Sequence, residues 1–166
     1  MTSSEAAIGY MDRTRRYYRA LGYANDYVWA NFDDVPFARL AKPLAKPLAQ
    51  SRIALITTSS PTDRSNRDAR GVKHVWSGPT ATPPDALFTD DLAWDKASTH
   101  TRDRESFLPV AACQALAETG LFAGLTAHFH GVSTEYSQRK TIEEDAPEVL
   151  ARLRDERAEG VILFPI

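Results

Sequence analysis

The sequence has a single cysteine, no long hydrophobic run and a net charge close to zero. The one cysteine, Cys113, excludes an intramolecular disulfide and a CxxC metal or redox motif within this chain. No apolar run approaches the roughly 20 residues that cross a bilayer, and the first residues lack the basic start and apolar core of a signal peptide. The net charge of −2 gives no bulk attraction to nucleic acid or to an anionic membrane. We therefore expect a cytoplasmic protein whose partners are neither nucleic acid nor membrane.

Two glycine-based motifs are also missing. The apolar run RIALITT at 52–58 is followed by SSPTDRSNRDARG, which has no glycine before Gly71, so the Rossmann fingerprint is absent. There is no GxSxG elbow, and Cys113 lies in the middle of a predicted helix, so nothing in the sequence favours a serine or cysteine nucleophile. The hydroxyl groups of Thr58 and Ser59 are candidates to bind an anion or a substrate, although serine and threonine are common in any turn.

The elements expected after residue 50 alternate between strands and helices. Apolar runs that are typical of strands lie at 52–58, 125–130 and 161–166, with shorter candidates at 73–76 and 92–97. Helices are expected at 109–119, before Gly120, and at 142–157. This alternation predicts an α/β fold with an open, mostly parallel sheet and helices on both faces. We divide the chain into an N-terminal helix with an extended aromatic and proline-containing arm, 1–50, and a sheet domain, 51–166.

The N-terminal arm is rich in aromatic residues. A helix is expected at 3–21, and its interleaved arginines and tyrosines favour a solvated basic face over a nucleic-acid surface. The loop after it contains Tyr23, Tyr27, Trp29, Phe32 and Phe37. An exposed aromatic segment favours an interface, so we expect a homo- or hetero-oligomer that forms through this arm. Pro43 and Pro47 then predict an extended connector.

The clearest candidate for a site is the segment 125–139. Side chains of a strand alternate between faces, so His128 and His130 are predicted to share one face while Phe129 points to the other. A glycine then ends the strand, and ligands of α/β proteins bind beyond the carboxyl ends of strands. The segment therefore predicts where a ligand binds, without naming the reaction.

Two chemistries remain open there, beside plain hydrogen-bonded or packed histidines. In an acid–base pocket for a small-molecule substrate, the candidate catalytic residues are His100, His128, His130 and Glu135, because imidazoles titrate near neutral pH and a carboxylate can orient one of them. The candidate substrate-binding residues are Asp103, Tyr136, Arg139, Thr58 and Ser59, with the guanidinium suited to a carboxylate. Alternatively, His128 and His130, joined by His100 or Glu135, have the ligand types of a zinc site. A metal is the one cofactor that these residues suggest.

Four segments occur in an order that is familiar from one protein family. They are MDRTRRYYRALGYANDYVWANFDDVPFARLAKPLA, SRIALITTSS, THTRDRESFLPVAACQALAETGLFAGL and HFHGVSTEYSQRKTIEEDAPEVLARLRDERAEGVILFPI. Together they resemble the component B family of glycine, sarcosine and betaine reductases, the selenoprotein B-like proteins, which include the D-proline reductases. The resemblance covers most of residues 11–166 and depends chiefly on THTRDRESFLP and HFHGVSTEYSQR.

The resemblance implies an α/β domain and the reductive cleavage of a carbon–heteroatom bond, typically C–N, together with partner subunits. A thiol or selenol carries that chemistry, because it is both a strong nucleophile and a good leaving group. The family's Cys or Sec motif follows the strand that matches VILFPI, and no residue of this sequence matches it. The reactive group would then come from a longer chain or a partner, or the reaction has been lost.

We therefore expect a reductase-family domain, an oxidoreductase in the sense of the resemblance, that binds a small amino-acid-like or carboxylate substrate. A non-catalytic interaction subunit is the first alternative. A metal-dependent enzyme that uses His100, His128 and His130 is the second.

Overall fold

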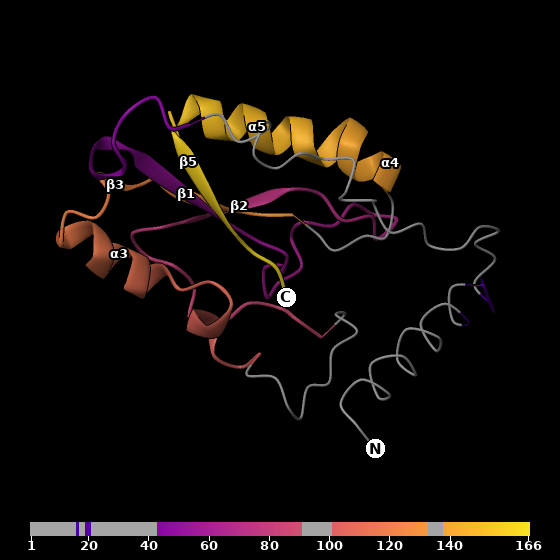
Figure 1. Cartoon of the computed structure of the whole chain (residues 1–166). Coiled ribbons are helices and arrows are strands. Elements are labelled where there is room, and N and C mark those ends of the chain that lie inside the picture. Colours follow the sequence, from indigo (N-terminus) through magenta and orange to yellow (C-terminus); the bar gives the residue numbers. More distant parts are fainter. Residues whose placement is uncertain (1–15, 17–18, 21–42, 91–100, 133–137) are drawn as a thin grey trace, which may run out of the picture. The chain divides into compact units, whose positions relative to one another are not determined.

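The computed structural model describes residues 16, 19–20, 43–90, 101–132 and 138–166 (Figure 1). The chain forms two compact units, Met1–Pro43 and Leu44–Ile166. In the first unit, Arg16, Arg19 and Ala20 are helical and exposed. The rest of the predicted N-terminal helix, the aromatic segment and the extended segment predicted at 92–97 lie outside the described residues.

The second unit contains a sheet to which the described residues contribute five strands. Its central strand β1, Arg52–Thr57, pairs in parallel with β5, Gly160–Phe164, and with the short strands β3, Gly124–Leu125, and β4, His128–Gly131. Strand β2, Trp76–Pro79, pairs with β4 in the antiparallel direction. The sheet is thus mostly parallel, and the predicted α/β fold class is confirmed.

The strand predicted at 125–130 is divided in two. Ile53 of β1 pairs with Leu125, but Ile56 pairs with His130, so Thr126 and Ala127 are two extra residues between β3 and β4. The backbone N–H of Thr126 still donates to the carbonyl of Ile53 at 2.9 Å. Its hydroxyl donates to the carbonyl of His128 at 2.8 Å, which stabilises the bulge locally.

The strand predicted at 73–76 begins later than expected, at Trp76, and continues to Pro79. Two features permit this. Pro79 lies at the end of β2, where a missing backbone donor is tolerated. Gly78 lies against Phe129, and a Cβ at residue 78 would be only 2.5 Å from the ring atom Cζ. The absence of a side chain at residue 78 therefore lets β2 approach β4.

Helix α3, Val110–Glu118, begins after Pro109 and ends before Gly120, as predicted. Gly120 has a φ of +79°, which a glycine adopts without strain. The second predicted helix, 142–157, is a longer helical run. Its parts are α4, Gln138–Lys140, a π-helical turn η4, Thr141–Asp145, and α5, Ala146–Asp155. The short 3₁₀ turns η2, Leu48–Gln50, and η3, Arg104–Ser106, complete the described helices.

Helices α3 and α5 lie on opposite faces of the sheet (Figure 1). On the α3 face the core contains Ile53, Leu55, Phe129, Val110 and Cys113, and on the α5 face it contains Ala54, Ile56, Val75, Val149 and Leu153. Alternate residues of β1 therefore enter different cores, as expected for a strand that is buried on both faces. This division decides which side chains of β4 point toward α5.

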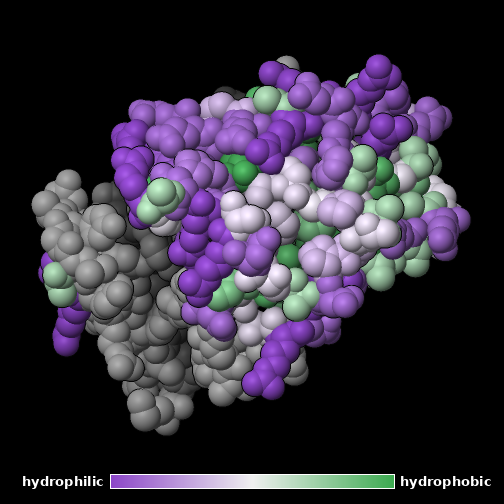
Figure 2. Space-filling view, turned by 180° about the vertical axis from the view of Figure 1, so that it is seen from behind, coloured by the Kyte–Doolittle hydropathy of each residue, from purple (hydrophilic) through white to green (hydrophobic). Residues whose placement is uncertain are grey.

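The surface seen in Figure 2 is dominated by hydrophilic side chains, with apolar ones interspersed among them. None of the helices in the described part of the chain has the length and apolar character that a membrane span requires.

Candidate functional site

His128 and His130 lie on the face of β4 that α5 covers, while Phe129 between them is fully buried in the core beneath α3. The two imidazoles differ in exposure. His130 is only 1% exposed, whereas the side chain of His128 is 49% exposed. The shared face follows from strand alternation, but the difference in burial depends on the strand and the helix that flank each ring.

His130 has a hydroxyl as its partner on the neighbouring strand. The antiparallel register places Ser77 of β2 directly opposite His130, and the two side chains meet with 2.8 Å between Oγ and Nδ1. Arg152 of α5 donates from Nη1 to the same Oγ at 2.7 Å. A guanidinium has no acceptor, so the serine oxygen accepts from Arg152, and its own O–H is available to donate to Nδ1 of His130. With the hydrogen bond in that direction, the proton of a neutral His130 lies on Nε2.

The environment of His130 favours this neutral form. Burial lowers the pKa of His130. The Glu156 carboxylate acts to raise this pKa, while the positive charge of Arg152 and the nearby His128 lower it further. Its Nε2 is buried and has no hydrogen-bond partner among the described residues. An uncharged imidazole therefore lies beside an exposed hydroxyl.

His128 is held in the opposite way, by a carboxylate. Glu156, just after α5, accepts from the backbone N–H of His128 at 3.0 Å and contacts its Nδ1 at 2.7 Å. Burial acts to raise the pKa of Glu156, but hydrogen bonds from the His128 backbone and ring outweigh it, so the pKa is lowered and the group is an anion. Because a carboxylate anion only accepts, Nδ1 of His128 carries a proton, and Nε2 of this half-exposed ring has no partner in the part of the chain that the structure describes.

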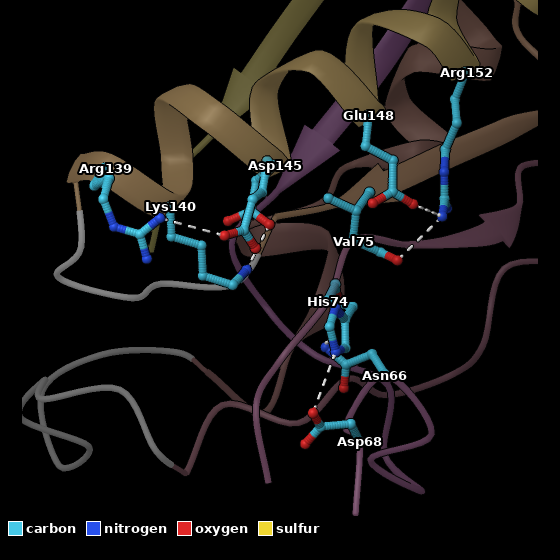
Figure 3. A network of polar contacts seen from close by, with 10 residues as sticks. Asn66, Asp68, His74, Val75, Arg139, Lys140, Asp145, Glu148 and Arg152 are labelled. Carbon is cyan, nitrogen blue, oxygen red and sulfur yellow. Dashed lines mark hydrogen bonds and ion pairs between the residues drawn. The ribbon is translucent and has the colours of Figure 1, made fainter. Parts of the chain in front are cut away.

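Charges of opposite sign alternate along the side of α5 that faces these rings. Arg152 forms an ion pair with Glu148 and donates from Nη2 to the carbonyl oxygen of Val75 at 3.2 Å (Figure 3). Glu148, Arg152 and Glu156 are spaced four residues apart, which places them on one side of the helix. We call Ser77, His128, His130, Arg152 and Glu156 the α5-face site.

The other predicted site residues that the structure describes take part in local contacts. The Thr58 hydroxyl accepts from the backbone N–H of Ile166 at 2.9 Å. Ser59 is buried and its hydroxyl shares a hydrogen bond with that of Thr57. Asp103 accepts from the N–H of Glu105 and thereby caps η3, and Arg139 pairs with Glu143 and Glu144 in solvent. None of these contacts joins the α5-face site.

The remaining predicted residues, His100, Glu135 and Tyr136, lie outside the described residues. Within the described residues no group of three or more His, Cys, Asp or Glu side chains is arranged to hold a metal ion. His128 and His130 supply two imidazoles on one face, and a third ligand was expected from His100 or Glu135. The metal site therefore stays a prediction.

Cys113 is buried in the core beneath α3. Burial raises the pKa of its thiol, and the negative charge of Glu105 raises it further. A neutral, enclosed thiol on that face of the sheet is unsuited to attack a substrate bound near His128 on the other face.

Ser77, Arg152 and Glu156 were not among the residues predicted from the sequence. The regular spacing of Glu148, Arg152 and Glu156 was a usable signal, because side chains at i and i+4 share a helix face. Ser77 offered no such signal, since only the register of β2 on β4 places it beside His130.

Comparisons with known proteins give no relative: no family model, no curated protein and no solved structure matches this chain. The resemblance to the reductase component B family accordingly stays a prediction.

Proposed function

We propose that the unit Leu44–Ile166 binds a small amino-acid-like molecule at the α5-face site and transfers a proton to or from it. Arg152 takes the carboxylate of the substrate, Glu156 faces its ammonium group, and His128 is the acid–base residue. The observation that carries the proposal is the double contact of Glu156 with His128, which leaves Nε2 of a half-exposed imidazole without a partner among the described residues.

The acid–base role follows from how proton transfer works in proteins. A general base must be accessible and must keep a fixed orientation, and an imidazole with a carboxylate on its second nitrogen meets both requirements. The second contact of Glu156, to the backbone N–H of His128, holds the carboxylate in register with the strand. The ring is thereby aimed by two fixed elements, β4 and the end of α5.

The substrate class follows from the charges. Among the described residues, Ser77, Val75 and Glu148 use only some of the five N–H donors of Arg152, which keeps the others for a carboxylate. Anionic groups stand on both sides of it along α5, and they disfavour a ligand that is only negative. A zwitterion places its negative group on Arg152 and its positive group toward the flanking carboxylates.

Reductive C–N cleavage, which the family resemblance suggests, needs a thiol or selenol that Cys113 does not supply. We assign to this chain the substrate binding and the proton transfer, and to a partner subunit the reactive sulfur or selenium. The aromatic arm is the proposed contact with that partner or with a second copy, and the proposed location is the cytoplasm.

The test is a titration that is followed by NMR of the histidine ring protons. Glycine should shift the His128 signals in a saturable way, while acetate and methylammonium, which carry one charge each, should bind at least tenfold more weakly. Arg152→Gln should abolish the glycine response, and Arg154→Gln, an exposed arginine on the same helix, should preserve it. Unchanged His128 signals at high glycine, or equal binding by Arg152→Gln, would contradict the proposal.

A further inference from the structure

The α5-face site contains a second reactive group that the proposed function does not use. Ser77 is exposed, it lies on a strand rather than in a loop, and its hydroxyl lies between the cation of Arg152 and the imidazole of His130. The 2.8 Å between Oγ and Nδ1 falls in the range for a nucleophile and its base, and Nη1 donates to the same oxygen at 2.7 Å.

We propose that Ser77 is a nucleophile that accepts the acyl group of a small ester, with His130 as its general base and Arg152 as the cation beside the reacting oxygen. The hydrogen-bond geometry carries the inference. Arg152 can only donate to Oγ, so the serine O–H is available to Nδ1 of His130 at 2.8 Å, which is where the proton must go when Oγ attacks.

The reaction that these groups support conserves atoms and needs no oxidant or reductant. Ser77 Oγ forms a bond to the carbonyl carbon while its proton passes to Nδ1 of His130. The C–O bond to the alcohol then breaks, and the same proton leaves with the alcohol. Water, deprotonated by His130, next attacks the acyl group, which releases the acid and restores the Ser77 hydroxyl.

Two further features suit this chemistry. The carboxylate of Glu156 is close enough to favour a positive charge on His130, so the imidazolium that forms during attack is partly compensated. The remaining N–H groups of Arg152 are donors for the negative oxygen of the tetrahedral intermediate. The inference uses the same site as the proposed function, but it does not depend on an amino-acid-like substrate.

The test is covalent labelling with a dialkyl fluorophosphate, in which Ser77 Oγ bonds to phosphorus and fluoride leaves. Peptide mass mapping of the treated full-length chain should place the adduct on Ser77. His130→Asn keeps an acceptor oxygen for the hydroxyl but removes the base, and it should slow labelling about 100-fold or more. Ser106→Ala, which removes an exposed hydroxyl that donates to the carbonyl of Asp103 at 2.7 Å, should label at the rate of the unchanged protein.

His130 is buried, so circular dichroism must show that His130→Asn is folded. If it is not, Arg152→Gln decides, with an expected loss of about tenfold or more in labelling rate. No adduct on Ser77 in the folded protein, or an undiminished rate in the folded variant, would overturn the inference. Failure of glycine to bind, with an adduct still on Ser77, would remove only the proposed substrate class. Glycine binding without an adduct would remove the nucleophile and keep the proposed function.

Discussion

Replacement of Gly131 by alanine is the sharpest test of the strand register that builds the site. Gly131 pairs with Trp76 across the β2–β4 ladder, and the same register places Ser77 opposite His130. A Cβ at residue 131 would lie 1.7 Å from Nε1 of Trp76, closer than any contact between unbonded atoms. The indole must therefore move.

The cost can be worked out from what the indole holds in place. Nε1 of Trp76 donates to the carbonyl of Ser59 at 2.9 Å, and the ring meets Phe129 edge-on with centroids 5.4 Å apart. The hydrogen bond contributes about 1 kcal/mol and the ring pair about 0.5–1.5 kcal/mol, and forced overpacking adds about 1 kcal/mol or more. Gly131→Ala should lower the free energy of unfolding by about 2–4 kcal/mol.

Urea denaturation followed by circular dichroism measures this loss. Gly71→Ala is the comparison: residue 71 has a positive φ but open space around a Cβ, so it should lose only about 1 kcal/mol. In a Trp76→Leu background the penalty of Gly131→Ala should shrink by at least about 1 kcal/mol, because the clashing ring is gone. A Gly131→Ala variant as stable as Gly71→Ala would refute the register of β2 on β4. The pairing of Ser77 with His130 depends on that register and would be refuted as well.

Two further predictions concern buried charge. Because burial lowers the pKa of His130, the unfolded chain binds a proton at a pH where the folded chain does not. The free energy of unfolding is therefore unaffected by His130 above about pH 6.5, and it declines as the pH falls toward the folded pKa. Denaturation between pH 7.5 and about 5 should show this decline, and His130→Asn should reduce it. An equal decline in the variant would show that groups other than His130 cause it. Lys140 and Asp145 form a buried ion pair of 2.6 Å, whereas Arg139 beside them pairs in solvent (Figure 3). Lys140→Met should therefore cost about 3–5 kcal/mol and Arg139→Met at most about 1 kcal/mol, and equal costs in urea denaturation would contradict the difference in burial.

Local sequence patterns were enough to predict the strands and helices that are determined by interactions within one segment. The run that became β1 is apolar on both faces because both are covered, and α3 lies between a proline and a glycine that define its ends. The apolar run after Gly160 likewise forms β5. Strand β2 was misplaced because it depends on Gly78 fitting against Phe129, a contact between distant parts of the chain that no local pattern contains.

The candidate site divides in the same way. Alternation along one strand placed His128 and His130 on a shared face, since that needs only the period of a strand. Their partners Ser77, Arg152 and Glu156 come from another strand and a helix, and neither the register nor the docking of α5 can be read from spacing within one segment. Thr58 and Ser59 carry the right chemical groups, but those groups are used by the chain itself.

The central claim is that the two histidines of β4 are held as opposite tautomers. The Ser77 hydroxyl holds the proton of His130 on Nε2, and Glu156 holds that of His128 on Nδ1. Long-range ¹H–¹⁵N correlation spectra of the imidazoles at about pH 8, where an ordinary histidine is neutral, test it directly. The nitrogen shifts should show the proton of His130 on Nε2 and that of His128 on Nδ1. A His130 protonated on Nδ1, or two rings in the same form, would contradict the claim.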